Sequence, residues 1–336
     1  MYADHAFAVL DVHAGGNPAR IIYSGLPRVT GATMMERMRR FEAEHDWIRR
    51  AMVLEPHGGN NTSAVVLTDP ITPDAHVGAF FMEAHGYLPM CGSDTLALAT
   101  ALIESGQVTP TGPVTTVRID TPAGLIEATA HVEGRKVTSV TFHSAPAFCL
   151  HHQVALTIPD HAVLTVDIAY GGNFYVLVDA RELGVTHFDS TNTAPMVALA
   201  HAIRNAANST YDIAHPEIPE IRDATHVLFF LPPLEPGGPT RDMVVMPTGA
   251  VDRSPCGTGT TSKVATLTAR GELEFGAPFT HISPIGSTFT GQAIERLDIG
   301  GLPGCRVAIT GSAFITADST LYVNSADELA GGFQLS

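Results

Sequence analysis

Short apolar runs recur along the chain between glycine and proline residues, and this pattern predicts many strands. We expect strands over residues 51–54, 63–67, 114–119, 125–132, 137–142, 163–169, 174–178, 226–231 and 243–246. Stretches with helical periodicity are fewer, and they predict helices over residues 32–44, 94–104, 194–207 and 260–269. Because strands do not alternate regularly with helices, the pattern favours an α+β fold over a doubly wound parallel sheet.

One short motif occurs twice. Segments 91–95 (Cys-Gly-Ser-Asp-Thr) and 256–260 (Cys-Gly-Thr-Gly-Thr) share the pattern C-G-[S/T]-x-T, and each comes before a predicted helix. Two further pairs of segments match in the same order: 11–17 with 167–173, and 121–124 with 283–286. Three ordered matches at nearly one offset indicate an internal duplication. The sequence therefore predicts two homologous halves, each with one cysteine at the start of a helix.

A cysteine at the start of a helix lies beside free backbone N–H groups and the positive end of the helix dipole. Such surroundings lower a thiol pKa, and the same N–H groups can hold a carboxylate. We therefore expect Cys91 and Cys256 to be reactive. Cys149 and Cys305 stand in apolar, strand-like stretches and are expected to be small buried residues.

Two thiols on opposite sides of one bound carbon acid could invert its stereocentre. One thiolate would remove the proton from Cα, and the opposing thiol would return a proton to the other face. Because one group must be ionised and the other protonated, the pair should titrate as a coupled system. The alternatives are structural cysteines left by an ancient duplication, and a cysteine protease, which needs one cysteine with a histidine partner.

Composition narrows the choice of function. With 336 residues, 45% of them hydrophobic and 16% charged, the chain can form one large domain or two ordinary ones. Its net charge of −15 argues against binding to nucleic acid or anionic lipid. The chain has no signal-peptide pattern and no apolar run that could span a bilayer, so we expect a cytoplasmic protein. The histidines lack paired metal-ligand spacing, so no metal is expected.

Segment 252–260 (Asp-Arg-Ser-Pro-Cys-Gly-Thr-Gly-Thr) resembles the second catalytic signature of the proline racemase family, and segment 90–92 resembles the first. Segments 11–16, 55–58 and 167–175 also fall where that family has similar sequences, so the resemblance covers residues 8–317. It implies the diaminopimelate epimerase-like fold, in which two α+β domains each wrap strands around a central helix and the site lies in the interdomain cleft. The expected domains are residues 1–148 with 318–336, and residues 149–317.

The resemblance also implies roles for particular residues. Cys91 and Cys256 would be the acid and base, with no pyridoxal phosphate or other cofactor, and Asp252 would lie near the substrate nitrogen. Backbone N–H groups would bind the substrate carboxylate, and these are expected near Gly92, Ser93, Gly257 and Thr258.

The implied substrate is a small proline-type imino acid, with 4-hydroxyproline favoured, and a homodimer is left open as the oligomeric state. Ser93 and Asp94 stand where racemases and epimerases of this family usually have His and a small residue, so contacts to the ring substituent should differ. The related trans-3-hydroxyproline dehydratases typically have Thr at the position of Cys256, which favours epimerisation. The alternatives are that dehydratase, proline racemase, and a binding protein without chemistry.

Four further side chains allow two interpretations each. His13 could approach the cleft or accept a local hydrogen bond in a turn. Tyr170 and Phe174 could line an apolar wall for a pyrrolidine ring or pack in the core. Arg253 could touch the substrate or brace its own loop, and the second is expected.

Overall fold

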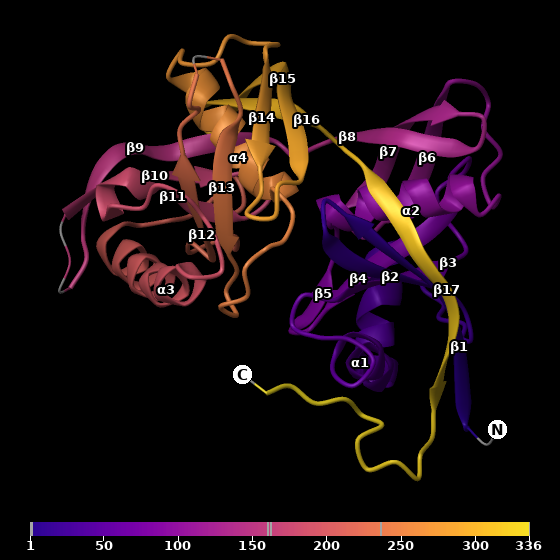
Figure 1. Cartoon of the computed structure of the whole chain (residues 1–336). Helices are drawn as coiled ribbons and strands as arrows, with labels where there is room; N and C mark the ends of the chain where they lie inside the picture. Colours follow the sequence, from indigo (N-terminus) through magenta and orange to yellow (C-terminus); the bar gives the residue numbers. More distant parts are fainter. Residues whose placement is uncertain (1–2, 160, 162, 236, 336) are drawn as a thin grey trace. The chain divides into compact units, whose positions relative to one another are not determined.

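The computed structural model describes residues 3–159, 161, 163–235 and 237–335 (Figure 1). The chain divides into two compact units, Met1–Phe142 with Gly311–Ser336, and His143–Thr310. The boundaries expected from the sequence, 148/149 and 317/318, lie a few residues later in the chain. Among the described residues, no helix is both long enough and apolar enough to cross a membrane.

In the first unit a strand layer surrounds one helix. Its strands pair in the order β17-β1-β2-β3-β4-β6-β7-β8, with β5 added beside β4. The pairs β2–β3 and β4–β6 are parallel and the others are antiparallel. The elements are β1 His5–Ala14, β2 Asn17–Ser24, α1 Met34–Val53, β3 Ser63–Thr68, β4 Val77–Glu83, β5 Gly86–Leu88, α2 Gly92–Glu104, β6 Val114–Thr121, β7 Gly124–Glu133, β8 Lys136–His143 and β17 Ala313–Val323.

The second unit repeats this arrangement. Its strands pair in the order β9-β10-β11-β12-β13-β14-β15-β16, and the parallel pairs, β11–β12 and β13–β14, fall at the same two places. A β16–β9 pairing closes the ring into a barrel. The elements are β9 Ala147–Thr157, β10 Val163–Tyr170, β11 Phe174–Asp179, η1 Ala180–Leu183, α3 Thr193–Thr210, β12 His226–Leu231, β13 Thr240–Val245, α4 Gly257–Ala269, β14 Pro278–Ile282, β15 Thr288–Ile299 and β16 Leu302–Gly311.

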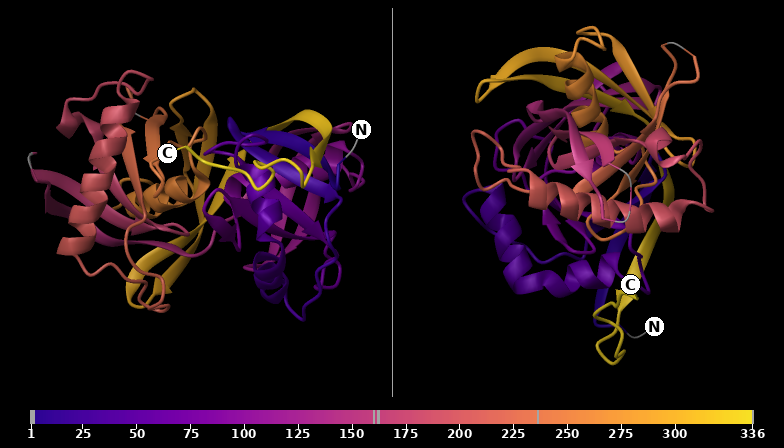
Figure 2. Two further views of the ribbon diagram at one scale, coloured as in Figure 1. Left: turned by 90° about the horizontal axis from the view of Figure 1, so that it is seen from below. Right: turned by 90° about the vertical axis from the view of Figure 1, so that its left-hand side faces the viewer.

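The matching strand orders confirm the duplication and the α+β class that the sequence predicted. In both units the helix after the repeated cysteine, α2 or α4, is the buried central one. The outer helix, α1 or α3, follows the third strand of the shared order, β2 or β11. Alternate residues of β11 show the two layers: Val176 faces the core that includes α3, and Leu177 belongs to the cluster that contains Cys256. Figure 2 shows the long outer helix α3 running along one side of the strands of this unit.

The central helices are buried for different reasons. α2 is apolar almost all round, from Leu96 to Ile103, as expected of a helix without a solvent face. α4 is rich in hydroxyl groups, and two of them return to backbone carbonyls of the same helix: Ser262 Oγ donates to Gly259 O and Thr266 Oγ1 to Ser262 O. These bonds satisfy the hydroxyls locally, so the polar helix can also be enclosed.

One predicted element is wrong. Residues 51–54 were expected to form a strand, but Ala51–Val53 are the end of α1, which also extends well beyond the predicted 32–44. Apolar positions keep the helical period past an irregular residue, His45, and bury Phe41, Ile48 and Met52 on one face. Core packing therefore continues a helix that the short apolar run alone does not distinguish from a strand.

Candidate active site

Cys91 is the N-cap residue of α2. Its carbonyl oxygen accepts hydrogen bonds from Thr95 N (3.0 Å) and Thr95 Oγ1 (2.7 Å), which fixes the first turn. The Sγ atom lies 3.4 Å from Ser93 Oγ. Gly92 is required beside it, because a Cβ atom at that position would lie 2.7 Å from the Phe142 ring. The Cys-Gly pair thus combines a thiol with close packing of the helix start against β8.

Cys256 is the corresponding N-cap residue of α4 and has an unusual backbone, with φ 61° and ψ 108°. A positive φ is strained for a residue with a side chain, and such strain is concentrated at functional sites. The Sγ atom accepts a hydrogen bond from Gly259 N at 3.4 Å and lies 3.6 Å from Thr258 Oγ1. The strained backbone holds the thiol against the first turn of the helix.

Tyr175 is a third partner of Cys256 that the sequence analysis missed. Its hydroxyl lies 3.2 Å from Cys256 Sγ and 2.6 Å from Thr258 Oγ1, and its ring is fully buried. Because Phe174 faces the α3 core, strand alternation places Tyr175 toward α4. The sequence shows that Phe174 and Tyr175 face opposite sides of a strand. Only the structure shows that α4 lies on the side of Tyr175.

Each cysteine has unbonded N–H groups beside it. Among the described residues, the backbone N–H groups of Gly92, Ser93, Gly257 and Thr258 have no hydrogen-bond partner. All four belong to the first turns of α2 and α4, where no intrahelical acceptor exists. Gly92 and Ser93 therefore lie with Cys91 in one unit, and Gly257 and Thr258 lie with Cys256 in the other. Both helix starts can receive an anionic group.

Asp252 lies in the loop before Cys256, and its carboxylate accepts hydrogen bonds from Ser254 N (2.8 Å) and Ser254 Oγ (2.9 Å). Burial raises its pKa despite these bonds. The structure thus brings Asp252 together with Cys256, Gly257 and Thr258, as the order of the motif requires. A carboxylate here could face a positively charged group of a ligand.

A second carboxyl group, Asp242 on β13, is completely buried, and its oxygens have no hydrogen-bond partner within the described part of the chain. Burial, together with the charge of Asp252, raises its pKa well above the ordinary value. His281 Nδ1 lies 3.7 Å from it, but burial lowers the pKa of His281 to about 3, so the ring is neutral. Ionisation of Asp242 is therefore disfavoured, whereas the hydrogen bonds from Ser254 favour the charged form of Asp252.

The thiol pKa values differ from the sequence-based expectation. Burial, followed by the charge of Asp252, raises the pKa of Cys256 to about 12, and burial with Asp94 raises that of Cys91 well above its ordinary value. The expectation of a lowered pKa at the helix start was wrong for both thiols. Loss of hydration and nearby carboxylates outweigh the helix dipole.

The four further side chains for which the sequence allowed two interpretations all have structural roles. Tyr170 and Phe174 are 7% and 1% exposed and pack in one core cluster with Phe148. His13 Nδ1 accepts a hydrogen bond from Gly16 N at 3.2 Å, as expected of a turn histidine. Arg253 donates to the carbonyl oxygen of Val251 and so braces its own loop.

Comparison with known proteins agrees with this architecture. The profile of the proline racemase family matches residues 9–334. A 4-hydroxyproline 2-epimerase from Brucella suis is 38% identical over 333 residues, which cover 99% of both chains. An uncharacterised Bacillus anthracis protein is 40% identical over 335 residues, covering 100% of this chain and 96% of the other. The crystal structure of a hydroxyproline epimerase from Agrobacterium vitis, with bound trans-4-hydroxy-L-proline, matches with a TM-score of 0.87 and 31% identity, covering 100% of this chain and 96% of that one.

Two copies of one α+β unit, each built around a buried helix that begins at a cysteine, define a class of isomerases with the diaminopimelate epimerase-like fold. Within that class, the match of the proline racemase family profile to residues 9–334 identifies the family. This chain belongs to the proline racemase family, and it is an isomerase of the racemase and epimerase type.

Proposed function

We propose that this chain is a 4-hydroxyproline 2-epimerase that uses Cys91 and Cys256 as its acid and base. The observation that carries the proposal is the recurrence of a cysteine at the N-cap of both central helices, α2 and α4. The names of the Brucella suis relative and the Agrobacterium vitis structure support 4-hydroxyproline as the substrate. Cys256 favours inversion over dehydration, because inversion needs a second group on the far face of Cα.

In the proposed reaction the free N–H groups at the starts of α2 and α4 bind the substrate carboxylate, and Asp252 faces the ring ammonium. One thiolate takes the Cα proton, and the electron pair of the C–H bond moves into the carboxylate as an enolate. The N–H groups stabilise the negative charge that develops there. The second thiol then donates its proton to the opposite face of Cα, and the configuration is inverted.

The proposed substrate brings a positive charge to the site beside Asp252. A raised thiol pKa leaves both cysteines protonated in the resting protein. A ring ammonium bound beside Asp252 offsets that carboxylate and stabilises a thiolate on Cys256. Binding therefore activates the base at the moment when it is needed.

The test is Cα exchange in heavy water with 4-hydroxyproline as substrate. We expect Cys91→Ser and Cys256→Ser each to abolish inversion, while Cys305→Ala, which changes a buried cysteine of β16, retains it. Full activity in Cys256→Ser would remove the two-thiol mechanism.

The same assay identifies the substrate when proline and both hydroxyproline regioisomers are compared. Release of a ketimine from trans-3-hydroxyproline would assign the chain to the dehydratases instead, and proline exchange without 4-hydroxyproline exchange would make it a proline racemase. Substrates must be compared because Ser93 and Asp94 replace the His and small residue that are usual in racemases and epimerases of this family.

A further inference from the structure

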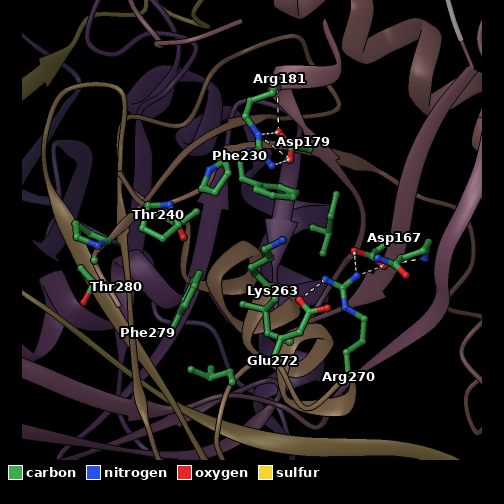
Figure 3. Close-up of a pocket in the computed structure, with 18 of the residues that line it drawn as sticks. Asp167, Asp179, Arg181, Phe230, Thr240, Lys263, Arg270, Glu272, Phe279 and Thr280 are labelled. Carbon is green, nitrogen blue, oxygen red and sulfur yellow. Dashed lines mark hydrogen bonds and ion pairs between the residues drawn. The ribbon is translucent and has the colours of Figure 1, made fainter. Parts of the chain in front are cut away.

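A cavity of about 700 Å³ lies in the second unit, and none of the residues that contact the Cys256 thiol through hydrogen bonds lines it (Figure 3). Its walls come from β10 to β14 and from the C-terminal half of α4, and much of the surface is apolar, including Leu177, Phe230, Leu273 and Phe279. Cys256 and Tyr175 do not line it. The cavity is therefore distinct from the residues that bind the substrate in the proposed reaction, and that reaction does not use it.

Lys263, in the middle of α4, directs its amine into this cavity (Figure 3). It is one of only two lysines in the chain, and it is 3% exposed. Within the described residues its Nζ has no hydrogen bond or ion pair, and it lies 3.2 Å from the centroid of the Phe230 ring. An isolated ammonium in such a place is costly, because a ring face replaces only part of its hydration.

The acidic groups around the cavity are already engaged. Arg270 pairs with Asp167 at 2.9 Å and with Glu272 at 2.7 Å, and Arg181 pairs with Asp179 at 2.6 Å. Burial lowers the pKa of Lys263 to about 8, although Asp167, Glu272 and Asp179 act in the opposite direction. About a tenth of the amine is therefore neutral at pH 7 and about half at pH 8. A neutral, desolvated lysine amine is a nucleophile.

The charges of the cavity indicate what kind of molecule it can receive. Four acidic and three basic residues line it, so an anionic ligand would add to an existing negative excess. A neutral carbonyl compound adds no charge, and its apolar body would contact the aromatic and aliphatic walls. We propose that Lys263 forms an imine with a small neutral aldehyde that occupies this cavity. The Nζ lone pair attacks the carbonyl carbon to give a carbinolamine, which then loses water, and no oxidant or reductant is needed.

The experiment uses the intact protein, benzaldehyde as the probe and sodium cyanoborohydride to trap the imine, with peptide mass spectrometry as the readout. The second lysine, Lys136, is exposed and serves as an internal control. We expect benzylation of Lys263 at pH 7.5 to be at least tenfold faster than that of Lys136. The adduct should persist in Lys136→Arg and disappear in Lys263→Arg, because arginine cannot form the imine.

Labelling of Lys136 with no adduct on Lys263 in the native wild-type protein would overturn the proposal. So would an adduct on Lys263 that appears only after unfolding in urea, since the cavity would then play no part. Neither comparison requires a variant to fold. Because the readout is a covalent adduct rather than Cα exchange, its failure is distinguishable from failure of the proposed epimerase activity.

Discussion

Tyr175 places one buried hydroxyl between two side chains of the candidate site, Cys256 and Thr258. Burial and the neighbouring thiol raise the pKa of Tyr175 well above 10, so the group stays a phenol and can donate a hydrogen bond. That bond lowers the pKa of the Cys256 thiol and so opposes the effect of burial. Tyr175 is therefore a positioning residue that also makes the thiolate easier to form.

Tyr175→Phe should keep the packing of the ring and lose the hydroxyl. We expect kcat for Cα exchange to fall roughly tenfold, the equivalent of one hydrogen bond to a charged group. The alkylation rate of Cys256 should shift to higher pH in the same variant. Tyr170→Phe is the matched control, since Tyr170 packs in the other core cluster and should leave both measurements unchanged.

Lys263 should lower the stability of the protein at neutral pH. Its folded pKa of about 8 lies below the ordinary value of 10.5, so the unfolded chain binds more protons between these values. The stability of the wild type consequently rises with pH across that window, and at pH 7 the full penalty applies. Lys263→Met should therefore stabilise the protein by roughly 1–3 kcal/mol at pH 7, with a smaller gain near pH 10.

Urea unfolding of Lys263→Met at the two pH values measures this difference. Lys136→Met provides the comparison, because an exposed lysine should change stability by less than about 0.5 kcal/mol. A loss of stability in Lys263→Met at pH 7 would mean that the ring contact with Phe230 outweighs the cost of burying the charge.

At the scale of elements, the two helices that carry the cysteines were predicted from local sequence alone. The repeated Cys-Gly-[S/T]-x-T motif gives both their starts and the residues of their first turns, since capping is decided within a few residues. The partners of these turns were not predictable in the same way. Tyr175 and Asp242 reach Cys256 and Asp252 through strand pairing, and the order β11-β12-β13 cannot be inferred from the hydrophobic pattern.

Several strands were missed in the sequence because one of their faces is exposed and the other is buried or half-buried. β17 and β15 alternate between buried or half-buried and exposed residues with many Thr, Asp and Glu side chains, so no continuous apolar run marks them. The outer helix α1 shows the opposite case, where a continuous apolar run belongs to a helix. In both cases the neighbouring element, rather than the segment itself, decides the conformation.

The start of α2 depends on the absence of a side chain at Gly92. In Gly92→Ala the new Cβ would meet the Phe142 ring at 2.7 Å, so the buried ring or the start of α2 must shift. We expect a loss of roughly 1–3 kcal/mol in stability and a clear loss of Cα exchange, because Cys91 moves with the helix start. Gly112→Ala is the control, since its Cβ meets no atom within 4 Å.

Combining Gly92→Ala with Phe142→Leu tests the cause. If the ring contact is responsible, the double variant should be destabilised by less than the sum of the two single changes. Strict additivity in urea unfolding would indicate that Gly92 matters for another reason.

At the scale of the whole molecule, the duplication gives the chain two thiols of the same kind, and both are protonated in the resting state. The two-thiol mechanism requires one of them to be ionised. Because both thiol pKa values lie above the neutral range, the ionised fraction grows as the pH rises. We expect kcat/KM for 4-hydroxyproline to increase about tenfold per pH unit from pH 7 to pH 9.

Initial rates of Cα exchange across that range are the measurement. A profile that is flat or falls with pH would show that a thiolate already exists in the free protein, contrary to the effect of burial on both groups.

The pairing of β1 with β17 joins the beginning and the end of the chain, with His5 opposite Val323. The whole second unit is thus inserted between two parts of the first. During synthesis on the ribosome, residues 143–310 are complete before the strand that neighbours β1 has emerged. The second unit can therefore complete its native strand pairing first. The first unit cannot complete its own until β17 has been synthesised, because β1 lacks that neighbour until then.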